Sequence, residues 1–382
     1  MKIAYVSTFD AQQVNSWSGT GYTIAKALER QGIEIAYIGP LKEKNSLLYK
    51  AKQFFYRDIL KKRHIRQAEP EILRDNARQI TEQLEVINPD IVFAIWAHPI
   101  AYLECKQPIV FVADATFPLM HNYYGDYTNL SAATIRNVRA FEQSALDRSA
   151  AIIYSSKWAA TSATKDYGIS PDKVYVVPFG ANIDTPPCEQ EIEQFIQNRI
   201  DSNVCKLLFL GVDWERKGGN TAIKIAMYLH NKGIPVELNI VGCLPPDANV
   251  PEYVKLLGFL KKSDPNDVVK LKELFENSHF LILPSIADCT PIVFAEANSF
   301  GLPCISTTVG GIPSMITNGI NGQLFDLDAL AESYSDFISE KMSTPAAYQN
   351  LARLSFKEYK TRLNWDVAGK QIKNILDNLI KK

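Results

Sequence analysis

The 382-residue sequence has almost no net charge, no long apolar run and no closely spaced pair of cysteines. Its 41 Lys and Arg balance 42 Asp and Glu. This balance argues against a nucleic-acid-binding protein, because such proteins carry an excess of basic residues that neutralise phosphates. No stretch approaches the ~20 apolar residues of a membrane span, and the apolar run at residues 1–7 is too short for a signal peptide. These absences predict a globular cytoplasmic protein.

The six cysteines and five histidines do not form a recognisable metal-binding pattern. No two cysteines make a Cys-x-x-Cys motif, so their spacing predicts neither a zinc knuckle nor a small disulfide framework. The histidines show no metal-ligand spacing either. We therefore expect no metal and no cofactor. At ~150 residues per domain, the length predicts two or three domains that each bury a core.

Short apolar, β-branched runs alternate with longer helical patterns, once in each half of the chain. This alternation is typical of parallel sheets with helices on both faces. The predicted strands are 3–7, 34–38, 91–96, 109–113, 151–154 and 174–177 in the first half, and 206–212, 236–241, 254–259, 280–283 and 304–307 in the second. The sequence thus predicts an α/β protein with two Rossmann-like, doubly wound domains that face a central cleft. In such sheets ligands bind at the carboxyl ends of the strands.

A cluster of Pro and Gly at residues 178–187 separates the two halves and is the best candidate for an interdomain linker. We expect an N-terminal domain over residues 1–184 and a C-terminal domain over residues 185–360. Apolar residues at helical spacing in residues 361–382 predict a terminal helix that packs back on the N-terminal domain.

Residues 18–21, Ser-Gly-Thr-Gly, form a glycine-rich turn between the first strand and a helix. Glycine lets the backbone approach a ligand closely, and a helix N-terminus favours anions. The turn lacks the third glycine of a dinucleotide fingerprint and lies well after the strand, so we predict no nicotinamide site. On spacing alone, Gly19 and Gly21 fit a ligand loop and an ordinary helix start equally well.

Two adjacent cations, Arg216 and Lys217, stand between a predicted strand and a Gly-Gly pair that starts a helix. At the carboxyl edge of a parallel sheet such a pair suits a diphosphate, because Arg offers a planar fork of donors and Lys a compact charge. The alternative is a solvated basic turn. The position at the predicted cleft favours the binding role.

A second helix start follows the strand at 280–283. Thr290 and Pro291 are typical of an N-cap and of the first helical residue. The amides of Ile292 and Val293 would then lack helical partners and be able to receive phosphate oxygens.

Two carboxylates, Asp288 and Glu296, flank this helix start and suit sugar hydroxyls as acceptors. An acidic residue, seven others and then Glu resembles the signature of the retaining glycosyltransferases of family 4, which have the GT-B fold. The first acid of that signature is more often Glu than Asp. The resemblance covers nearly the whole chain and also includes a Gly-x-Pro strand at 301–303, a Gly-Gly turn at 310–311 and a segment at 318–325 that is similar to the family's "NGxxGxLF" hairpin.

The resemblance implies roles for the residues of the C-terminal half. Lys217, with Arg216, would hold the donor diphosphate, Glu296 the ribose hydroxyls and Asp288 the donor sugar. Val212 stands where the family commonly has an Arg. Catalysis in such enzymes resembles a same-face displacement in which the leaving diphosphate, stabilised by cations, assists deprotonation of the acceptor.

The N-terminal half contains the glycines that the resemblance assigns to the donor phosphates, Gly19 and Gly21, and the candidates for the acceptor side. Asp114 ends a predicted strand where the family often has a His, and it would either orient an acceptor hydroxyl or cap a loop. The other acceptor candidates are His98, His121 and Tyr123, each with a structural alternative, since a lone His or Tyr commonly packs in the fold.

Residues 42–66 hold nine Lys or Arg against two acidic residues, interleaved with Leu, Phe, Tyr and Ile. A basic amphipathic segment can dock on anionic lipid, which suits a lipid-linked acceptor and a peripheral place at the inner face of a membrane. The alternative is a solvated helix face.

The sequence as a whole predicts a retaining, metal-independent hexosyltransferase that moves a sugar from a nucleotide diphosphate to a hydroxyl of a glycan, a lipid-linked glycan or a small molecule. A UDP-sugar is favoured as donor because it is the commoner one among relatives, with a GDP-sugar as the alternative. Other hypotheses are a GT-B nucleotide-sugar epimerase and a non-catalytic, two-lobed binding protein for sugar nucleotides. No nucleic-acid partner is expected, and the oligomeric state is not predicted.

Overall fold

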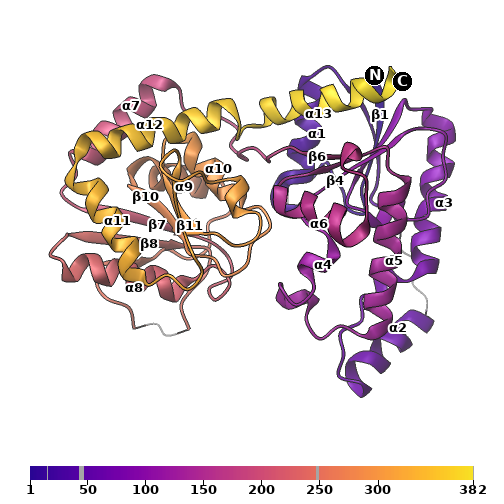
Figure 1. Ribbon diagram of the computed structural model, residues 1–382, viewed down its shortest axis with the longest axis horizontal. Helices are drawn as coiled ribbons and strands as arrows, with labels where there is room; N and C mark the ends of the chain where they lie inside the picture. The colour runs from indigo at the N-terminus through magenta and orange to yellow at the C-terminus, as the bar shows by residue number, and fades with distance from the viewer. Residues whose placement is uncertain (15, 43–46, 247–248, 382) are drawn as a thin grey trace. The chain divides into compact units, whose positions relative to one another are not determined.

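The computed structural model describes residues 1–14, 16–42, 47–246 and 249–381, which form two compact α/β units (Figure 1). Unit 1 comprises Met1–Pro178 and Trp365–Lys382, and unit 2 comprises Phe179–Asn364. Unit 1 therefore ends at Pro178 rather than at residue 184. The reason is that Ala181 is buried in the core of unit 2 and its amide donates to the carbonyl of Leu363 at 3.1 Å.

Unit 1 is built on a parallel sheet of six strands in the order β2-β1-β3-β4-β5-β6. The neighbouring strands β3, β4 and β5 are buried along their whole length, as the apolar runs predict. The strands are β1 (Lys2–Val6), β2 (Glu34–Ile38), β3 (Ile91–Ile95), β4 (Ile109–Ala113), β5 (Ala151–Tyr154) and β6 (Val174–Val176).

The main helices of unit 1 pack around this sheet, except for α2, which lies at the lower end of the unit (Figure 1). They are α1 (Thr20–Arg30), α2 (Leu47–Phe54), α3 (Pro70–Ile87), α4 (Phe117–Met120), α5 (Ala132–Arg148), α6 (Lys157–Tyr167) and α13 (Trp365–Ile380). Short helical turns lie at η1 (Trp17–Gly19), η2 (Phe55–Ile59), η3 (Arg66–Ala68), η4 (His98–Ile100), η5 (Gly125–Tyr127) and η6 (Pro171–Lys173). None of the helices in the described part of the chain is both long and apolar enough to cross a membrane.

The C-terminal helix α13 belongs to unit 1, where it packs against α1. A Cβ on Gly369 would lie 2.9 Å from the carbonyl oxygen of Ala27, so glycine allows the two helices to approach closely. Arg30 also pairs with Asp366 at 2.7 Å. The terminal helix begins at Trp365, four residues inside the expected segment, because α12 continues as far as Thr361.

Unit 2 repeats the plan with a second parallel sheet in the order β12-β11-β10-β7-β8-β9. Its sixth strand, β12, pairs in parallel with β11 from Gly322 to Phe325. The expected hairpin at 318–325 is therefore wrong: the segment is a turn followed by a parallel edge strand. The strands are β7 (Cys205–Leu210), β8 (Val236–Val241), β9 (Val254–Leu256), β10 (Phe280–Leu283), β11 (Cys304–Thr307) and β12 (Gly322–Phe325).

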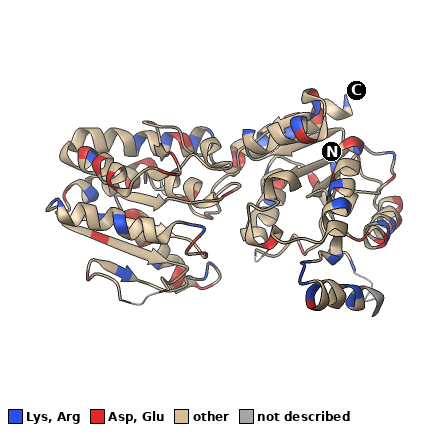
Figure 2. Ribbon diagram, turned by 60° about the horizontal axis from the view of Figure 1, so that its bottom comes forward, with Lys and Arg blue, Asp and Glu red and all other residues tan. Residues whose placement is uncertain are grey.

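Helices pack around the second sheet and cover its apolar residues (Figure 1). They are α7 (Glu189–Ile200), α8 (Gly219–Asn231), α9 (Pro265–Asn277), α10 (Ile292–Ser299), α11 (Ala331–Ser343) and α12 (Pro345–Thr361), with a helical turn η7 (Ile312–Ser314). Charged residues of both signs occur on both units (Figure 2).

Arg199, near the end of α7, is a buried cation in the interior of unit 2 and is only 1% exposed. Its guanidinium donates hydrogen bonds of 2.8–2.9 Å to four backbone carbonyls, those of Phe275 and Glu276 near the end of α9 and of Phe300 and Gly301 after α10. The carbonyls at a helix C-terminus have no intrahelical donor and carry partial negative charge. Arg199 therefore satisfies two helix ends at once and joins them.

His279 continues this network towards the sheet. Its Nδ1 accepts from the amide of Lys206 at 3.0 Å, so the proton is on Nε2, which donates to the carbonyl of Arg199 at 2.7 Å. Burial lowers the pKa of His279 to about 4. The ring is therefore neutral near pH 7, and its role is structural.

We predict that Arg199→Lys lowers the free energy of unfolding of unit 2 by about 3 kcal/mol, because a single ammonium cannot reach four carbonyls and leaves buried acceptors unpaired. Hydrogen exchange of β7 and β10 would report on unit 2 separately from unit 1. The matched control is Arg353→Lys, at an exposed pair with Glu193, which we expect to cost less than about 1 kcal/mol. Equal protection in the two variants would contradict the prediction.

Candidate functional site

The second sheet has a topological switch point between β7 and β10. These strands are neighbours, but β8 follows β7 on one side and β11 follows β10 on the other. Right-handed crossovers therefore place α8 and α10 on opposite faces, and the two loops part at the carboxyl ends of β7 and β10. Ligands of doubly wound sheets bind at this point. The predicted residues Arg216, Lys217 and Asp288 all lie on these two loops.

The structure brings these three predicted residues into contact. Lys217 Nζ lies 2.5 Å from Asp288 Oδ2, and Arg216 Nη1 lies 3.5 Å from the same oxygen. Ser285 Oγ donates to it at 3.4 Å. Lys217 and Asp288 are only 8% and 6% exposed, so their ion pair is largely shielded from water and correspondingly strong.

Further hydrogen bonds fix Arg216 between the two loops. Its Nε donates to Asp213 Oδ2 at 3.3 Å and its Nη1 to the carbonyl of Ala287 at 3.0 Å. In the opposite direction, the amide of Ile286 donates to the carbonyl of Arg216 at 2.8 Å. The loops after β7 and β10 are therefore joined through both side chain and backbone, which holds the cations in place.

Two positions in the loop after β7 need glycine because other atoms approach their backbone closely. Gly218 has φ +76°, and a Cβ there would lie 2.0 Å from the carbonyl oxygen of Pro284. A Cβ on Gly211 would lie 2.9 Å from Cγ of Lys217, so the lysine stem lies directly over Gly211. These glycines let the loop after β7 fold back against the loop after β10.

Helix α10 begins one residue later than predicted. Pro291, not Thr290, is the N-cap residue, with φ −71° and ψ 104°, and Ile292 is the first helical residue. Proline fixes φ near the value that this position needs, and no side-chain cap bond forms. The amides of Ile292 and Val293 are therefore in the first turn, as predicted, where helical amides have no intrahelical acceptor.

Glu296, on the second turn of α10, is 3% exposed and pairs with Lys262 Nζ. The prediction missed Lys262, which lies in the loop between β9 and α9. A signal was present: residues 261 and 262 are adjacent lysines after a predicted strand, the same pattern that singled out Arg216 and Lys217. Strand β9 ends at Leu256, three residues before the predicted end at residue 259, and both lysines lie in the loop in either case.

In unit 1, Gly19 is the N-cap residue of α1 and has the left-handed φ of +81°. Trp17 and Ser18 before it also have positive φ values, +48° and +54°, which non-glycine residues rarely adopt. Gly21 follows in the first turn of α1. A Cβ there would lie 3.0 Å from the ring of Phe9, so at least one reason for this glycine is packing.

Asp114 and His98 lie at the carboxyl edge of the first sheet, after β4 and β3. Asp114 Oδ2 accepts a hydrogen bond from Trp17 Nε1 at 3.3 Å, and Thr8 Oγ1 lies 3.2 Å from His98 Nε2. The ring of Trp96 stacks on His98 and also contacts Trp17. Burial lowers the pKa of His98 to about 4, so this half-buried ring acts near pH 7 as a neutral hydrogen-bonding group.

The remaining acceptor candidates, His121 and Tyr123, lie on the segment after α4. His121 stacks on Phe117 at a centroid distance of 5.5 Å, and Tyr123 packs against Trp158 at 5.4 Å. Both are half-buried. These ring contacts pack both side chains against neighbouring aromatic residues and so help to position this segment.

Glu142, a residue that the sequence did not single out, anchors the start of α4. Its Oε2 accepts from the amide of Phe117 at 2.8 Å and from the hydroxyl of Tyr167. Burial raises the pKa of Glu142 to about 7, against the lowering effect of these two donors. The carboxyl group therefore changes its protonation state near neutral pH.

Fold and site together define a two-domain glycosyltransferase architecture of the GT-B type, with an ion-paired loop cluster at a switch point. Family models agree. The model described as Glycosyltransferase Family 4 matches residues 21–185, and the model described as Glycosyl transferases group 1 matches residues 205–340. The chain belongs to this family of glycosyltransferases.

Curated relatives are distant. The chain is 26% identical to D-inositol 3-phosphate glycosyltransferase of Paenarthrobacter aurescens (strain TC1) over 243 residues, which cover 57% of this chain and 59% of that protein. The chain thus spans less than two thirds of the length of the curated relative it matches.

Solved structures share the fold over nearly the whole chain. Sucrose-phosphate synthase from Thermosynechococcus elongatus has a TM-score of 0.70 at 14% identity, with 100% of this chain and 99% of that chain covered. HepE of Anabaena, crystallised with UDP, has a TM-score of 0.67 at 16% identity, with 99% and 100% covered. At these identities the likeness shows the fold.

We predict that Glu142 makes the stability of unit 1 depend on pH. A pKa raised above the usual value of 4.5 means that the folded state favours the protonated carboxyl, so this contribution is present below about pH 4.5 and is lost as the pH rises through about 7. Relative to Glu142→Gln, which cannot ionise, the wild-type free energy of unfolding should fall by up to about 3 kcal/mol over this range.

Denaturant unfolding of both proteins at about pH 5 and about pH 8 would measure this difference. Glu104→Gln, at a mostly exposed glutamate, is the matched control and should show no such divergence. A constant difference between wild type and Glu142→Gln across the range would refute the prediction.

Proposed function

We propose that the chain is a retaining glycosyltransferase that transfers a sugar from a nucleotide diphosphate, with a UDP-sugar favoured over a GDP-sugar, to an acceptor hydroxyl. The acceptor would belong to a glycan, a lipid-linked glycan or a small molecule. The observation that carries the proposal is the convergence of Lys217 and Arg216 on Asp288 at the switch point of unit 2. This arrangement offers cations to a diphosphate and a carboxylate to sugar hydroxyls from the same pair of loops.

Support for the donor comes from chemistry and from likeness. The relative HepE was crystallised with UDP and with UDP-glucose. In this chain, the first-turn amides of Ile292 and Val293 would receive phosphate oxygens, since helix N-termini favour anions. Glu296 would accept hydrogen bonds from ribose hydroxyls after exchanging its contact with Lys262.

In the proposed reaction, Lys217 and Arg216 stabilise the negative charge that develops on the diphosphate as the glycosidic bond breaks. The leaving phosphate oxygen takes the proton of the acceptor hydroxyl, which attacks the same face of the sugar, so that the configuration is retained. Two protein cations supply the charge stabilisation that a metal provides in other transferases, and we therefore propose that the reaction needs no metal. Asp288 would hold the donor sugar, and Asp114 of unit 1 would orient the acceptor.

We predict that Lys217→Met weakens binding of UDP by about tenfold or more, which is the expected cost of losing one charge-assisted hydrogen bond to phosphate. The methionine stem still covers Gly211, and a thermal melt would verify that the variant is folded. Isothermal titration measures the affinity. Lys224→Met, at an exposed lysine of α8 in the same unit, is the matched control and should bind UDP like wild type. Equal affinity in both variants would remove Lys217 from the site.

We predict that the chain consumes a UDP-sugar in the presence of a suitable acceptor and that EDTA does not slow the reaction. Mass spectrometry of incubations with UDP- and GDP-sugars and a panel of hydroxyl acceptors would detect the product, and NMR would report the anomeric configuration. Conversion of the donor without acceptor would indicate an epimerase instead. Donor binding without turnover of any sugar would support a binding protein.

A further inference from the structure

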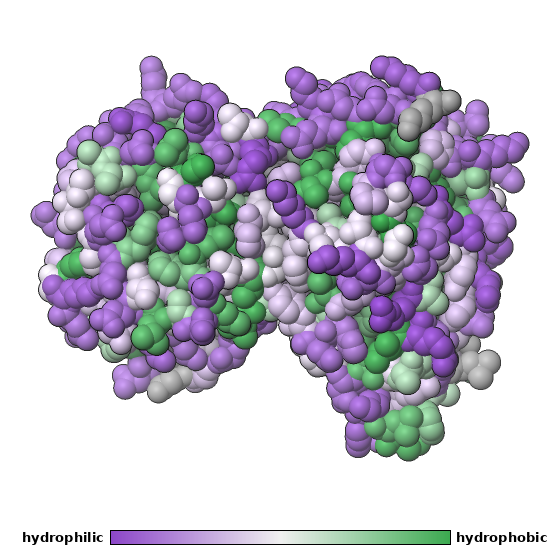
Figure 3. All heavy atoms as spheres, viewed as in Figure 1, coloured by the Kyte–Doolittle hydropathy of each residue, from purple (hydrophilic) through white to green (hydrophobic). Residues whose placement is uncertain are grey.

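A surface of unit 1 combines exposed apolar side chains with a basic hollow. We name it the α2 surface; it comprises residues 47 and 49–63, which include α2, η2 and the turn that follows. Five large apolar residues in it are between 45% and 83% exposed: Leu47, Phe54, Phe55, Ile59 and Leu60. Figure 3 shows this hydrophobic patch at the lower end of unit 1, over the segment that Figure 1 labels α2. Part of the predicted 42–66 segment, residues 43–46, lies outside the described residues.

Helical spacing divides the segment into an inward and an outward face. Lys52 and Tyr56, four residues apart, point towards the body of unit 1: Lys52 Nζ pairs with Glu69 at 2.7 Å, and Tyr56 stacks on His64 at a centroid distance of 4.5 Å. Phe55 and Ile59, also four apart, are exposed. The exposed apolar face is thus a consequence of how the segment is anchored.

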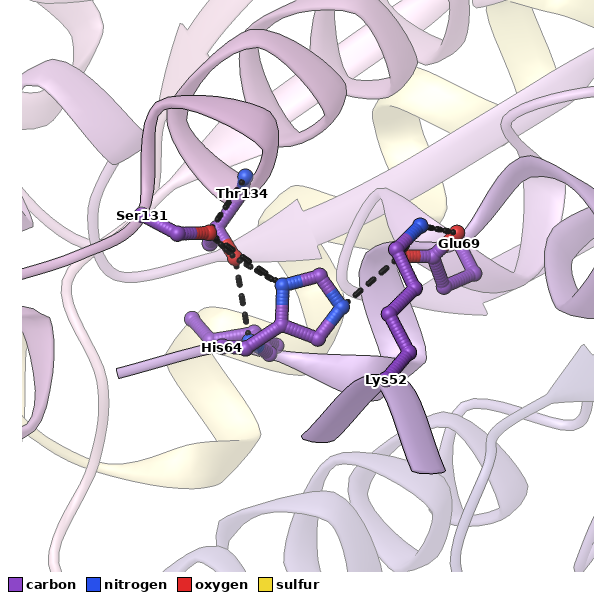
Figure 4. A network of polar contacts seen from close by, with 6 residues as sticks. Lys52, His64, Glu69, Ser131 and Thr134 are labelled. Carbon is purple, nitrogen blue, oxygen red and sulfur yellow. Dashed lines mark hydrogen bonds and ion pairs between the residues drawn. The ribbon is translucent and has the colours of Figure 1, made fainter. Parts of the chain in front are cut away.

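The anchor is a buried polar network (Figure 4). His64 Nε2 lies 2.8 Å from Glu69 Oε1, and its Nδ1 lies 3.2 Å from the hydroxyls of Ser131 and Thr134. His64 and Glu69 are 8% and 4% exposed. A satisfied network of this kind holds one geometry, so the apolar side chains are presented by an ordered scaffold.

Cations surround a hollow beside the apolar face. The hollow has a volume of about 530 Å³ and is lined by Arg57, Lys61, Lys62 and Arg63, with Asp126 as the acidic residue among its lining residues. Arg57 pairs with Asp58 at 2.9 Å and Arg63 with Asp126 at 3.2 Å, so the net positive charge of this group corresponds to that of Lys61 and Lys62. The four basic residues are exposed. Figure 2 shows Lys and Arg along this part of unit 1. A positively charged hollow of this size admits a phosphate-bearing head group.

We propose that the α2 surface docks unit 1 on an anionic lipid bilayer, with Phe54, Phe55 and Ile59 entering the interfacial region and the basic hollow receiving lipid phosphates. Charge complementarity selects this occupant: exposed apolar residues flanked by cations match a layer of anionic head groups over hydrocarbon. The proposal needs no sugar donor, and it stands or falls separately from the proposed transferase activity.

The test is co-sedimentation of the full chain with vesicles, without donor or acceptor. Wild type should bind vesicles of equal parts phosphatidylcholine and phosphatidylglycerol, bind pure phosphatidylcholine weakly, and lose binding as salt is raised. The triple variant Arg57→Gln, Lys61→Gln, Lys62→Gln should lose about a hundredfold in affinity for the anionic vesicles, as expected for three cations near such a surface.

Matched controls separate this surface from general charge and apolarity. A second triple variant removes the same charge from exposed positions of unit 2 and should bind like wild type: Lys224→Gln, Lys255→Gln, Lys357→Gln. The double variant Phe55→Ser, Ile59→Ser should lose about tenfold or more, whereas Val268→Ser, Val269→Ser, at exposed valines of α9, should lose nothing. UDP titration of every variant verifies that the proposed donor site is intact.

Three outcomes would overturn the proposal. Equal binding to neutral and anionic vesicles would remove the role of charge, and unchanged binding of the triple variant would remove the role of this hollow. If the double variant alters self-association in analytical ultracentrifugation but leaves vesicle binding unchanged, the apolar face is instead an interface between copies of the chain.

Discussion

The arrangement of unit 2 depends on the buried guanidinium of Arg199, which joins the C-termini of α9 and α10. Helix α10 has eight residues, too few to be stable alone in water, and its position therefore comes from tertiary contacts. Its N-terminal amides lie at the candidate site, at the other end of the helix from Arg199, and Glu296 lies one turn further along. A single side chain on α7 thus fixes one end of the helix that presents polar groups at the other. A buried cation with four carbonyl partners is specific in direction, since an apolar replacement would fill the space without orienting either helix end.

The loops at the switch point depend on a second constraint, the close contact of Gly218 with Pro284. This contact lets the backbone of the loop after β7 hydrogen-bond to the loop after β10. The cations and Asp288 are then held by backbone geometry instead of by long, mobile side chains alone. Unit 1 contrasts with this arrangement. At the carboxyl edge of its sheet, the indole of Trp17 donates to Asp114 and the ring of Trp96 stacks on a neutral His98.

The sequence predicted the features that depend on local pattern. β-Branched apolar runs located the strands, and the doubly wound topology that they imply placed the loops after β7 and β10 together, which is why Arg216, Lys217 and Asp288 could be grouped by their positions in the sequence. Features that depend on distant partners were missed. Nothing local marks Arg199 or Glu142 as buried, because their partners lie 76 or more and 25 residues away in the chain. The predicted N-cap of α10 was wrong by one residue. In a Thr-Pro pair either residue can be the N-cap, and the tertiary fold decides between them. Lys262 was missed because its partner, Glu296, lies 34 residues away in the chain.

The ion pair between Lys217 and Asp288 has a consequence for which anion the proposed site would prefer. Arg216 and Lys217 already have carboxylate partners in Asp213 and Asp288, so the cluster is close to neutral and attracts a free phosphate only weakly. A diphosphate that took both Lys217 and Arg216 would leave Asp288 buried without a cation, which is costly. A sugar attached to the diphosphate removes that cost, because its hydroxyls donate to the freed carboxylate. The complete donor then satisfies both members of the pair, whereas the diphosphate alone satisfies one. If the proposed donor site is correct, the pairing would favour the intact nucleotide sugar over its own leaving group, which would help to release the nucleotide after transfer.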